Sequence, residues 1–237
     1  MLAAVRSAAV LGIDALDVTV EVDVVPGLPA WTIVGLASSA VKEARERVSA
    51  ALANSGFDVP SRRVTVNLSP ADVRKDGTSF DLPIALALLA ATGALDASRL
   101  EGLVVAGELG LDGSIRPIRG TLSLARAATR ATACLVVPEP NVAEAMLTGG
   151  SRVATAATLT DLVRQLRTRG PALEPATPPR LRGQREPRRQ IQLFVEIRPL
   201  LPACSGNQQQ DGEDRSHGRY CPVCARGLYN RKSTNIA

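Results

Sequence analysis

Apolar and polar residues alternate near the start of the chain with the period of a half-buried β-strand. The alternation is clearest in Val18-Thr19-Val20-Glu21-Val22-Asp23. It predicts strands at 5–12 and 16–25, and a third strand at 30–36 follows the turn signal Pro26-Gly27-Leu28-Pro29.

A helical period begins at Ser38. Apolar residues recur there at every third or fourth position as far as Leu52, with charged residues on the other faces, which predicts an amphipathic helix. Ser38 or Ser39 is the expected N-cap, and Gly56 is the expected stop.

Strands and helices continue to alternate up to about residue 170. A strand predicted at 63–68 precedes an uncharged run at 82–95, whose Pro83 fits only the first turn of a helix. That helix should be buried on most sides. Further strands are predicted at 103–109, 115–118, 134–137 and 153–156, with a hairpin turn at Asp112-Gly113, and further helices at 121–130, 141–147 and 158–169. Asn141 and Thr158 are the expected N-terminal caps of the last two helices. The order predicts an α/β (α+β) fold, a mixed sheet with packed helices.

Composition places the chain among globular proteins. Of its 237 residues, 45% are hydrophobic, 22% are charged and only 3% are aromatic, so Ala, Val, Leu and Ile must build the core. No run of 18 apolar residues occurs, and the first residues lack the pattern of a signal peptide. We therefore expect a cytoplasmic protein with no membrane contact.

Charge and proline divide the chain near Gly170. Residues 1–170 carry 17 basic and 17 acidic side chains, whereas residues 171–237 carry 11 and 6, together with eight of the 16 prolines. The whole net charge of +5 therefore belongs to the second part. We predict a folded domain at 1–170 and a Pro/Arg-rich tail at 171–237 that is disordered or poorly packed.

The segment at 74–83, Arg-Lys-Asp-Gly-Thr-Ser-Phe-Asp-Leu-Pro, is the first candidate for chemistry. It puts Ser79 at the start of a buried helix, where unpaired N–H groups and the helix dipole stabilise an anion. Ser79 is thus a candidate nucleophile. In the alternative interpretation, Thr78 or Ser79 is simply an N-cap.

Several segments together resemble the N-terminal Lon-protease-like domain of the YifB/ComM family of Mg-chelatase-like AAA+ ATPases. They are Val34-Gly35-Leu36 with the helix after it, Val66-Asn67-Leu68-Ser69-Pro70-Ala71-Asp72, the segment at 74–83, and the Gly-Glu-Leu hairpin with Pro-Ile-x-Gly at 107–120. The resemblance covers about residues 1–170. It implies a ribosomal-protein-S5-domain-2-like fold shared with Lon peptidases. For the intact family it implies an ATP- and Mg-dependent hexameric ring that handles DNA in natural transformation and branch migration.

Lon peptidases use a Ser–Lys dyad, in which a lysine of lowered pKa removes the serine proton. By the resemblance Ser79 matches the serine, but Leu122 occupies the position of the lysine. The dyad is therefore degenerate, and no catalytic residue is expected. A Ser-dependent peptidase remains an alternative if Lys75 or Lys42 reaches Ser79 from another direction.

The family's phosphate-binding loop, Gly-x-x-x-x-Gly-Lys-Ser/Thr, is not found in the chain. Leu181-Arg182-Gly183-Gln184 resembles the entry to the ATPase module, and the resemblance stops after it. We hypothesise that the tail is a frameshift or truncation product, which the other two reading frames after Gln184 would test. The chain itself is then expected to bind no ATP or Mg and to be a non-catalytic module. Self-association or AAA+ ring subunits are its expected partners, and DNA only through the intact family.

The tail also offers a weak metal-binding pattern. Cys221-Pro222-Val223-Cys224 has the spacing of half a zinc knuckle, and Cys204 and His217 would complete four ligands. A second tightly spaced pair is missing, so we expect no metal site. A zinc or nucleic-acid adaptor remains an alternative function, whereas Cys134 lies in an apolar run and is expected in the core.

Overall fold

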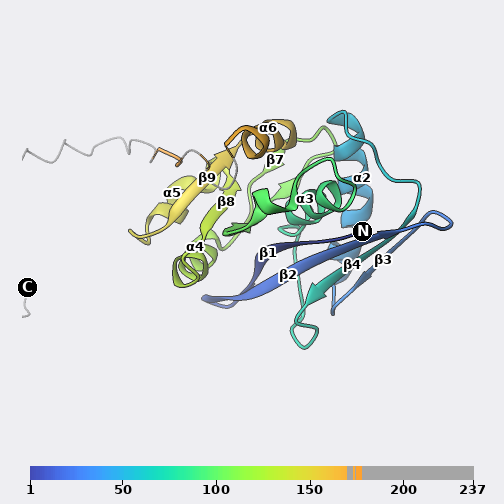
Figure 1. Cartoon of the computed structure of the whole chain (residues 1–237). Helices are drawn as coiled ribbons and strands as arrows, with labels where there is room; N and C mark the ends of the chain where they lie inside the picture. Colours follow the sequence, from blue (N-terminus) through green and yellow to red (C-terminus); the bar gives the residue numbers. More distant parts are fainter. Residues whose placement is uncertain (170–172, 174, 178–237) are drawn as a thin grey trace, which may run out of the picture. The chain divides into compact units, whose positions relative to one another are not determined.

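The structure, a computed structural model, describes residues 1–169, 173 and 175–177 of the chain (Figure 1). Its strands are β1 Leu2–Leu11, β2 Asp14–Val25, β3 Ala30–Val34, β4 Arg63–Ser69, β5 Leu103–Val105, β6 Glu108–Leu109, β7 Ile115–Arg116, β8 Cys134–Pro138 and β9 Arg152–Ala156. Its α-helices are α1 Ser39–Lys42, α2 Ala44–Asn54, α3 Asp81–Ala91, α4 Thr121–Arg130, α5 Val142–Met146 and α6 Leu159–Arg169, and 3-10 turns lie at Ala97–Leu100 and Glu139–Asn141. The predicted α/β class is confirmed.

The strands form two sheets and a hairpin. The first sheet has the order β1-β2-β4-β3, in which only the β3–β4 pair is parallel. The second sheet, β5-β8-β9, is parallel throughout, and β6 pairs with β7 as the hairpin predicted around Asp112-Gly113. Alternation in β2 buries Val18, Val20 and Val22 and leaves the residues between them partly exposed.

Helix α3 lies at the centre of the main core, packed against β1, β2 and α2 (Figure 1). Every one of its 11 residues is buried, as the uncharged run predicted. Pro83 stands in its first turn, where no intrahelical N–H bond is lost. Each fully buried leucine contributes about 1.5–3 kcal/mol, so α3 is the main apolar anchor of the fold. A second core cluster gathers around α4, β5 and β8.

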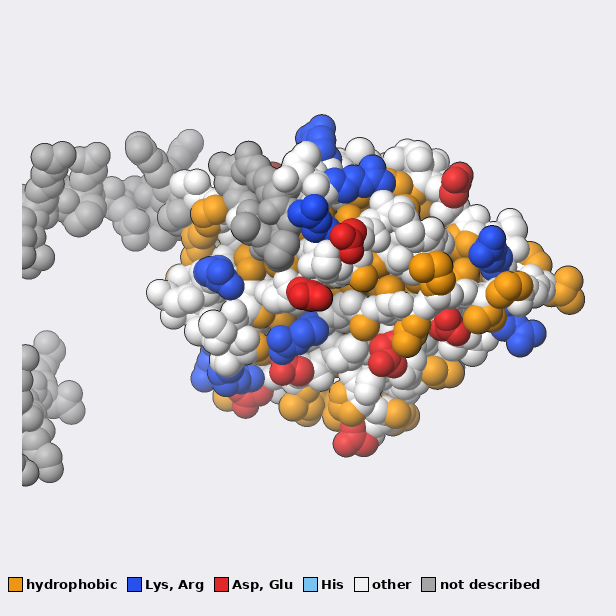
Figure 2. Space-filling model, viewed as in Figure 1, with side chains coloured by type: hydrophobic (Ala, Val, Ile, Leu, Met, Phe, Trp, Pro, Cys, Tyr) orange, Lys and Arg blue, Asp and Glu red, His pale blue; other side chains and the backbone are white. Residues whose placement is uncertain are grey.

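The basic and acidic side chains of the described surface are interspersed on the face shown in Figure 2. This agrees with the balanced charge of residues 1–170. None of the helices among the described residues is both long and apolar enough to span a bilayer.

Two predicted elements are interrupted. The helix predicted from Ser38 breaks at Glu43 into α1 and α2, and Ser38 stands at the N-cap of α1 without a side-chain capping bond. The strand predicted at 103–109 divides into β5 and β6, because the N–H of Gly107 donates to the carbonyl oxygen of Ser79 at 2.9 Å instead of to a neighbouring strand.

The two predicted caps have different outcomes. Thr158 accepts the N–H of Asp161 at 3.1 Å, which confirms it as a cap. Asn141 occupies the N-cap position of α5 but makes no capping bond. Its amide binds both main-chain groups of Ile118, at 2.9 and 2.8 Å, so it fastens the turn before α4.

The tail assignments at 178–237, including Cys204, His217, Cys221 and Cys224, lie outside the described residues. The domain boundary near residue 170 therefore stays a prediction. Cys134 is buried in β8, where desolvation raises the pKa of its thiol. Its assignment to the core is confirmed.

Candidate functional site

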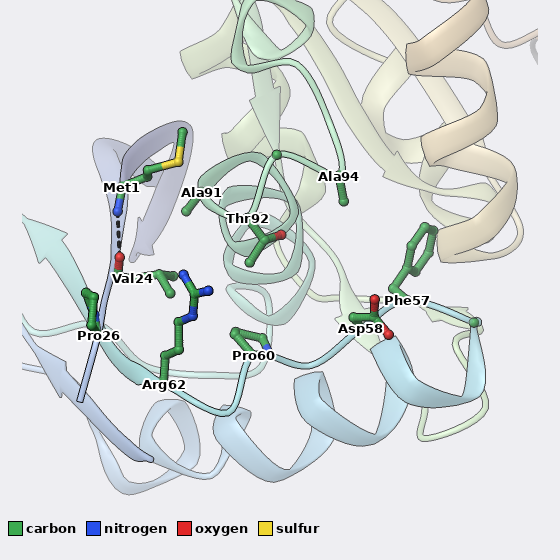
Figure 3. A pocket seen from close by; sticks show the side chains of 12 residues that line it. Met1, Val24, Pro26, Phe57, Asp58, Pro60, Arg62, Ala91, Thr92 and Ala94 are labelled. Carbon is green, nitrogen blue, oxygen red and sulfur yellow. Dashed lines mark hydrogen bonds between the residues drawn. The ribbon is translucent and has the colours of Figure 1, made fainter. Parts of the chain in front are cut away.

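A cavity of about 750 Å³ lies beside the C-terminal ends of α2 and α3 (Figure 3). Its lining includes Phe57 and Ala91, the last residue of α3. The N-terminal amine of Met1, another lining residue, donates to the carbonyl oxygen of Val24 at 2.5 Å. The side chains of Asp58 and Arg62 on its wall are both exposed. With no buried polar group turned into it among its lining residues, this cavity offers no catalytic arrangement.

A second cavity, of about 490 Å³, contains the candidate nucleophile. It lies where the loop before α3, strand β6 and the turn between β7 and α4 meet, and we call it the Ser79 cavity. Its lining residues are Val10, Asp76, Gly77, Thr78, Ser79, Glu108, Pro117, Ile118, Arg119 and Gly120. The structure thus brings together the two segments that the sequence singled out, 74–83 and 107–120.

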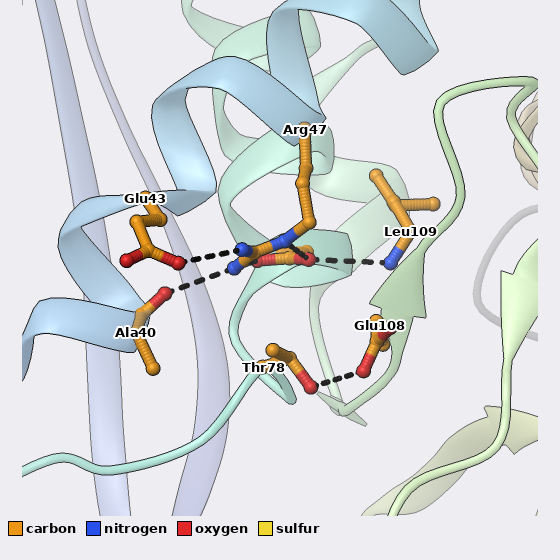
Figure 4. Close-up of polar contacts among 7 residues, drawn as sticks. Ala40, Glu43, Arg47, Thr78, Glu108 and Leu109 are labelled. Carbon is orange, nitrogen blue, oxygen red and sulfur yellow. Dashed lines mark hydrogen bonds and ion pairs between the residues drawn. The ribbon is translucent and has the colours of Figure 1, made fainter.

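Ser79 is half-buried in this cavity, just before α3. The N-cap of α3 is Phe80, with no side-chain capping bond, so the interpretation of Thr78 or Ser79 as the N-cap is wrong. The Thr78 hydroxyl is engaged elsewhere, because it donates to the carboxylate of Glu108 (Figure 4). Among the described residues, no side chain hydrogen-bonds to the Ser79 hydroxyl.

Lys75, one of the two alternative bases for Ser79, is fully buried although it lies in a polar loop. Its main chain forms a bridge with Ala37, and its Nζ donates to the carbonyl oxygen of Pro70. Desolvation lowers the pKa of the Lys75 amine, and the nearby charge of Asp72 opposes this shift. The amine therefore has a structural partner, and Lys75 is absent from the lining of the Ser79 cavity.

The other two positions considered for the lysine are 42 and 122. Lys42 is exposed at the end of α1. Leu122 is 39% exposed in α4, and its N–H donates to the Glu144 carboxylate at 3.0 Å. Neither residue lines the Ser79 cavity. Among the described residues, no lysine thus lines the cavity that holds Ser79.

Beneath the cavity lies a buried ion pair that joins α2 to α3 (Figure 4). The Arg47 guanidinium donates to both carboxylate oxygens of Asp81, at 2.7 and 3.0 Å, and also to the carbonyl oxygen of Ala40 at 2.9 Å. The N–H of Leu109 in β6 donates to the same carboxylate at 3.3 Å. Asp81 is only 1% exposed, so this carboxylate ties three elements together from inside the core.

Each member of the pair shifts the pKa of the other. Hydrogen bonding to Asp81 raises the pKa of Arg47, against the opposing effect of burial. Burial raises the pKa of the Asp81 carboxyl, and the bonds from Arg47 oppose that rise. The bidentate geometry is that of a guanidinium–carboxylate pair, which positions the start of α3 under the Ser79 cavity.

Sequence reasoning missed Arg47, Asp81 and Glu108. Arg47 is one of five charged residues among positions 42–47 of an amphipathic helix, and nothing in that pattern distinguishes it. Asp81 offered a signal, since it is the single charge between Asp76 and Asp96 at the head of a buried helix. Among the described residues, no three His, Cys, Asp or Glu side chains cluster closely enough to hold a metal ion.

Comparison with known proteins agrees with this architecture. Residues 20–141, slightly more than half of the chain, match the family described as subunit ChlI of Mg-chelatase. The chain belongs to this ChlI family. The matched range runs from β2 to Asn141 and includes both segments that form the Ser79 cavity.

Several relatives share this part of the ChlI-family chain. It is 48% identical over 143 residues to a protein named YifB of Salmonella typhimurium, covering 60% of this chain and 28% of that protein. It is 43% identical over 165 residues to "Competence protein ComM" of Haemophilus influenzae, covering 70% of this chain and 32% of that protein. The chain therefore matches less than a third of the length of these curated relatives, and the resemblance to YifB and ComM is confirmed.

Proposed function

We propose that the described domain is a non-catalytic module of a Mg-chelatase-related protein, and that it serves to associate with other protein segments. One observation carries this proposal. Lys75, the only lysine close in sequence to Ser79, is fully buried and has its amine bound to the carbonyl oxygen of Pro70. Without a lysine amine to remove its proton, the Ser79 hydroxyl remains a weak nucleophile.

A fluorophosphonate probe tests this proposal on the full chain. We expect no more label on the wild-type chain than on Ser79→Ala, while a serine hydrolase in the same tube is labelled. Label that depends on Ser79 and is lost in Lys75→Met would establish a Ser–Lys peptidase instead.

We propose further that the ATP-driven work of the family resides in segments that the longer relatives have beyond the matched part. The family resemblance supports this, as does the lack of a phosphate-binding loop motif in the chain. Calorimetry with Mg-ATP should then give no heat of binding. A micromolar affinity for ATP would contradict the proposal.

Any part in DNA handling should likewise be indirect. The 17 basic side chains of residues 1–170 are balanced by 17 acidic ones, and DNA affinity depends largely on the neutralisation of phosphates by excess positive charge. We expect duplex DNA to bind the full chain no more tightly than about 1 μM at physiological salt, as measured by fluorescence anisotropy. A nanomolar affinity that persists in high salt would contradict the proposal.

A further inference from the structure

Strand β3 is the open edge of the first sheet. It pairs with β4 on one side only. The N–H of Ala30 points to β4, where it reaches the carbonyl oxygen of Arg62 at 3.4 Å. In a parallel strand, the N–H and C=O groups of every second residue point toward the same neighbouring strand. Since the N–H of Ala30 points to β4, the N–H and C=O groups of Trp31 and Ile33 point to the open side. Both are ready to pair with a further strand.

This edge lacks the features that normally protect one. Natural edge strands carry charges, bulges or prolines that discourage pairing. Here no charged residue occurs between Asp23 and Lys42, and the prolines at 26 and 29 precede the strand. It carries exposed apolar side chains instead: its last residue, Val34, is 42% exposed, and Leu28 before it and Leu36 after it are 83% and 56% exposed. In Figure 2 hydrophobic side chains gather at the right-hand end of the molecule, where Figure 1 places the turn between β2 and β3.

The outer edge of β9 in the second sheet, in contrast to that of β3, carries protecting features. It begins with a charged residue, Arg152, and the N–H of Ala176 donates to its Val153 carbonyl oxygen at 2.7 Å. The other outer strand of the first sheet, β1, packs next to β5. Among the described edge strands of the two sheets, β3 is thus the one that is uncharged and is not covered by another described strand.

We infer that β3 pairs with β3 of a second copy of this chain, antiparallel and centred on Thr32. In this register Trp31 of one copy lies opposite Ile33 of the other, and each such pair exchanges both of its N–H···O=C bonds. These are the residues whose peptide groups already face outward. The two four-stranded sheets become one continuous sheet.

The side chains of this segment favour a second copy over an unrelated strand. Centring on Thr32 places Ala30 opposite Val34, and it brings Leu28 to the end where Leu36 of the second copy lies. Each exposed apolar residue of one copy therefore meets an apolar residue of the other. No like charges face each other, since the segment has none. A five-residue strand buries less than the roughly 1,600 Å² of a standard interface, so the association is reversible. This inference does not depend on the proposed lack of catalysis.

Analytical ultracentrifugation of the full chain over a range of concentrations tests the inference, with Thr32→Lys as the disrupting variant. Two lysines would then face each other at the centre of the pair. Thr65→Lys is the matched control, because Thr65 is the register partner of Thr32 on β4, one strand inward. We expect a monomer–dimer equilibrium whose dissociation constant rises at least about tenfold in Thr32→Lys and stays within about twofold in Thr65→Lys.

A second variant and a second readout guard against misfolding. Leu28→Glu changes an exposed turn residue outside β3 and should weaken the dimer in the same direction. Trp31, the single tryptophan of the chain, lies on the paired strand, so its emission should shift on dilution in the wild type but not in Thr32→Lys. A wild-type chain that is monomeric at all concentrations, or a dimer that both variants leave unchanged, would overturn the inference.

Discussion

Removing Arg47 should expose the energetic importance of the buried ion pair beneath the Ser79 cavity. Arg47→Met keeps the unbranched apolar stem of the side chain but leaves the Asp81 carboxylate, 1% exposed, with the N–H of Leu109 at 3.3 Å as its remaining partner. Breaking a buried pair from one side costs about 3–5 kcal/mol. The Arg47 side chain is 20% exposed, so water can partly replace it. We therefore expect a loss at the lower end, about 3 kcal/mol.

The loss of unfolding free energy in Arg47→Met should depend on pH, in a direction that the pKa of Asp81 determines. Burial already raises the pKa of Asp81 above the ordinary 3.8, and the variant lacks the bonds from Arg47 that oppose this rise. The folded variant therefore binds a proton at a pH at which the unfolded chain does not. Its stability deficit relative to wild type should be largest near neutral pH. The deficit should shrink as pH falls from the pKa of Asp81 in the variant to its lower, though still raised, pKa in the wild type, and it should stay constant below that.

Urea unfolding followed by circular dichroism at several pH values measures this deficit. Arg164→Met is the matched control, because Arg164 forms an ion pair with Asp161 on the surface, where its side chain is 71% exposed. That variant should lose less than about 1 kcal/mol. An Arg47→Met deficit below about 1 kcal/mol, or one that is constant with pH, would refute the assigned function of the pair.

Three further substitutions test other parts of the fold by the same unfolding assay. Gly35→Ala should lower the free energy of unfolding by more than about 2 kcal/mol, because the φ of Gly35 is +97° and a Cβ would lie 2.2 Å from the Leu68 carbonyl oxygen. Gly149→Ala is the control, since Gly149 has a φ of +70° but faces open space, and it should lose only about 1 kcal/mol. Equal losses in the two variants would contradict the predicted clash. Asn141→Ala should cost about 2 kcal/mol by removing its two bonds to the turn before α4, and a neutral result would show that the turn does not need them. Because the pKa of Lys75 is lowered in the folded chain, the wild type should gain stability relative to Lys75→Met as pH rises from that pKa to 10.5. A difference in unfolding free energy that does not change with pH would mean that the amine is not buried.

Local pattern predicted most elements of this fold. Alternation located β2 and β4 because each buries one face only. The uncharged run after Asp81 predicted a helix buried on most sides, and α4 runs over the predicted 121–130. Where the prediction failed, a tertiary bond competed with the local preference. The Gly107 N–H bonds to the Ser79 carbonyl oxygen and divides a predicted strand.

The site was only partly predictable for the same physical reason. Resemblance and helix-start chemistry pointed to Ser79, and the structure places it in a cavity with the turn at 117–120. The burial of Lys75 has no local signal, since it lies in a polar loop and depends on a bridge to Ala37, far away in sequence. The Arg47–Asp81 pair is likewise made by packing between α2 and α3.

Nitrogen-15 NMR of the lysine amines tests most directly whether Lys75 serves the fold and not Ser79. The chain has three lysines, at 42, 75 and 232, so their Nζ signals can be assigned by single substitutions. We expect the Lys75 signal to titrate below the ordinary 10.5 and to keep its shift and its titration curve in Ser79→Ala. A Lys75 signal that moves when the Ser79 hydroxyl is removed would mean that the two groups interact, and it would contradict a non-catalytic domain.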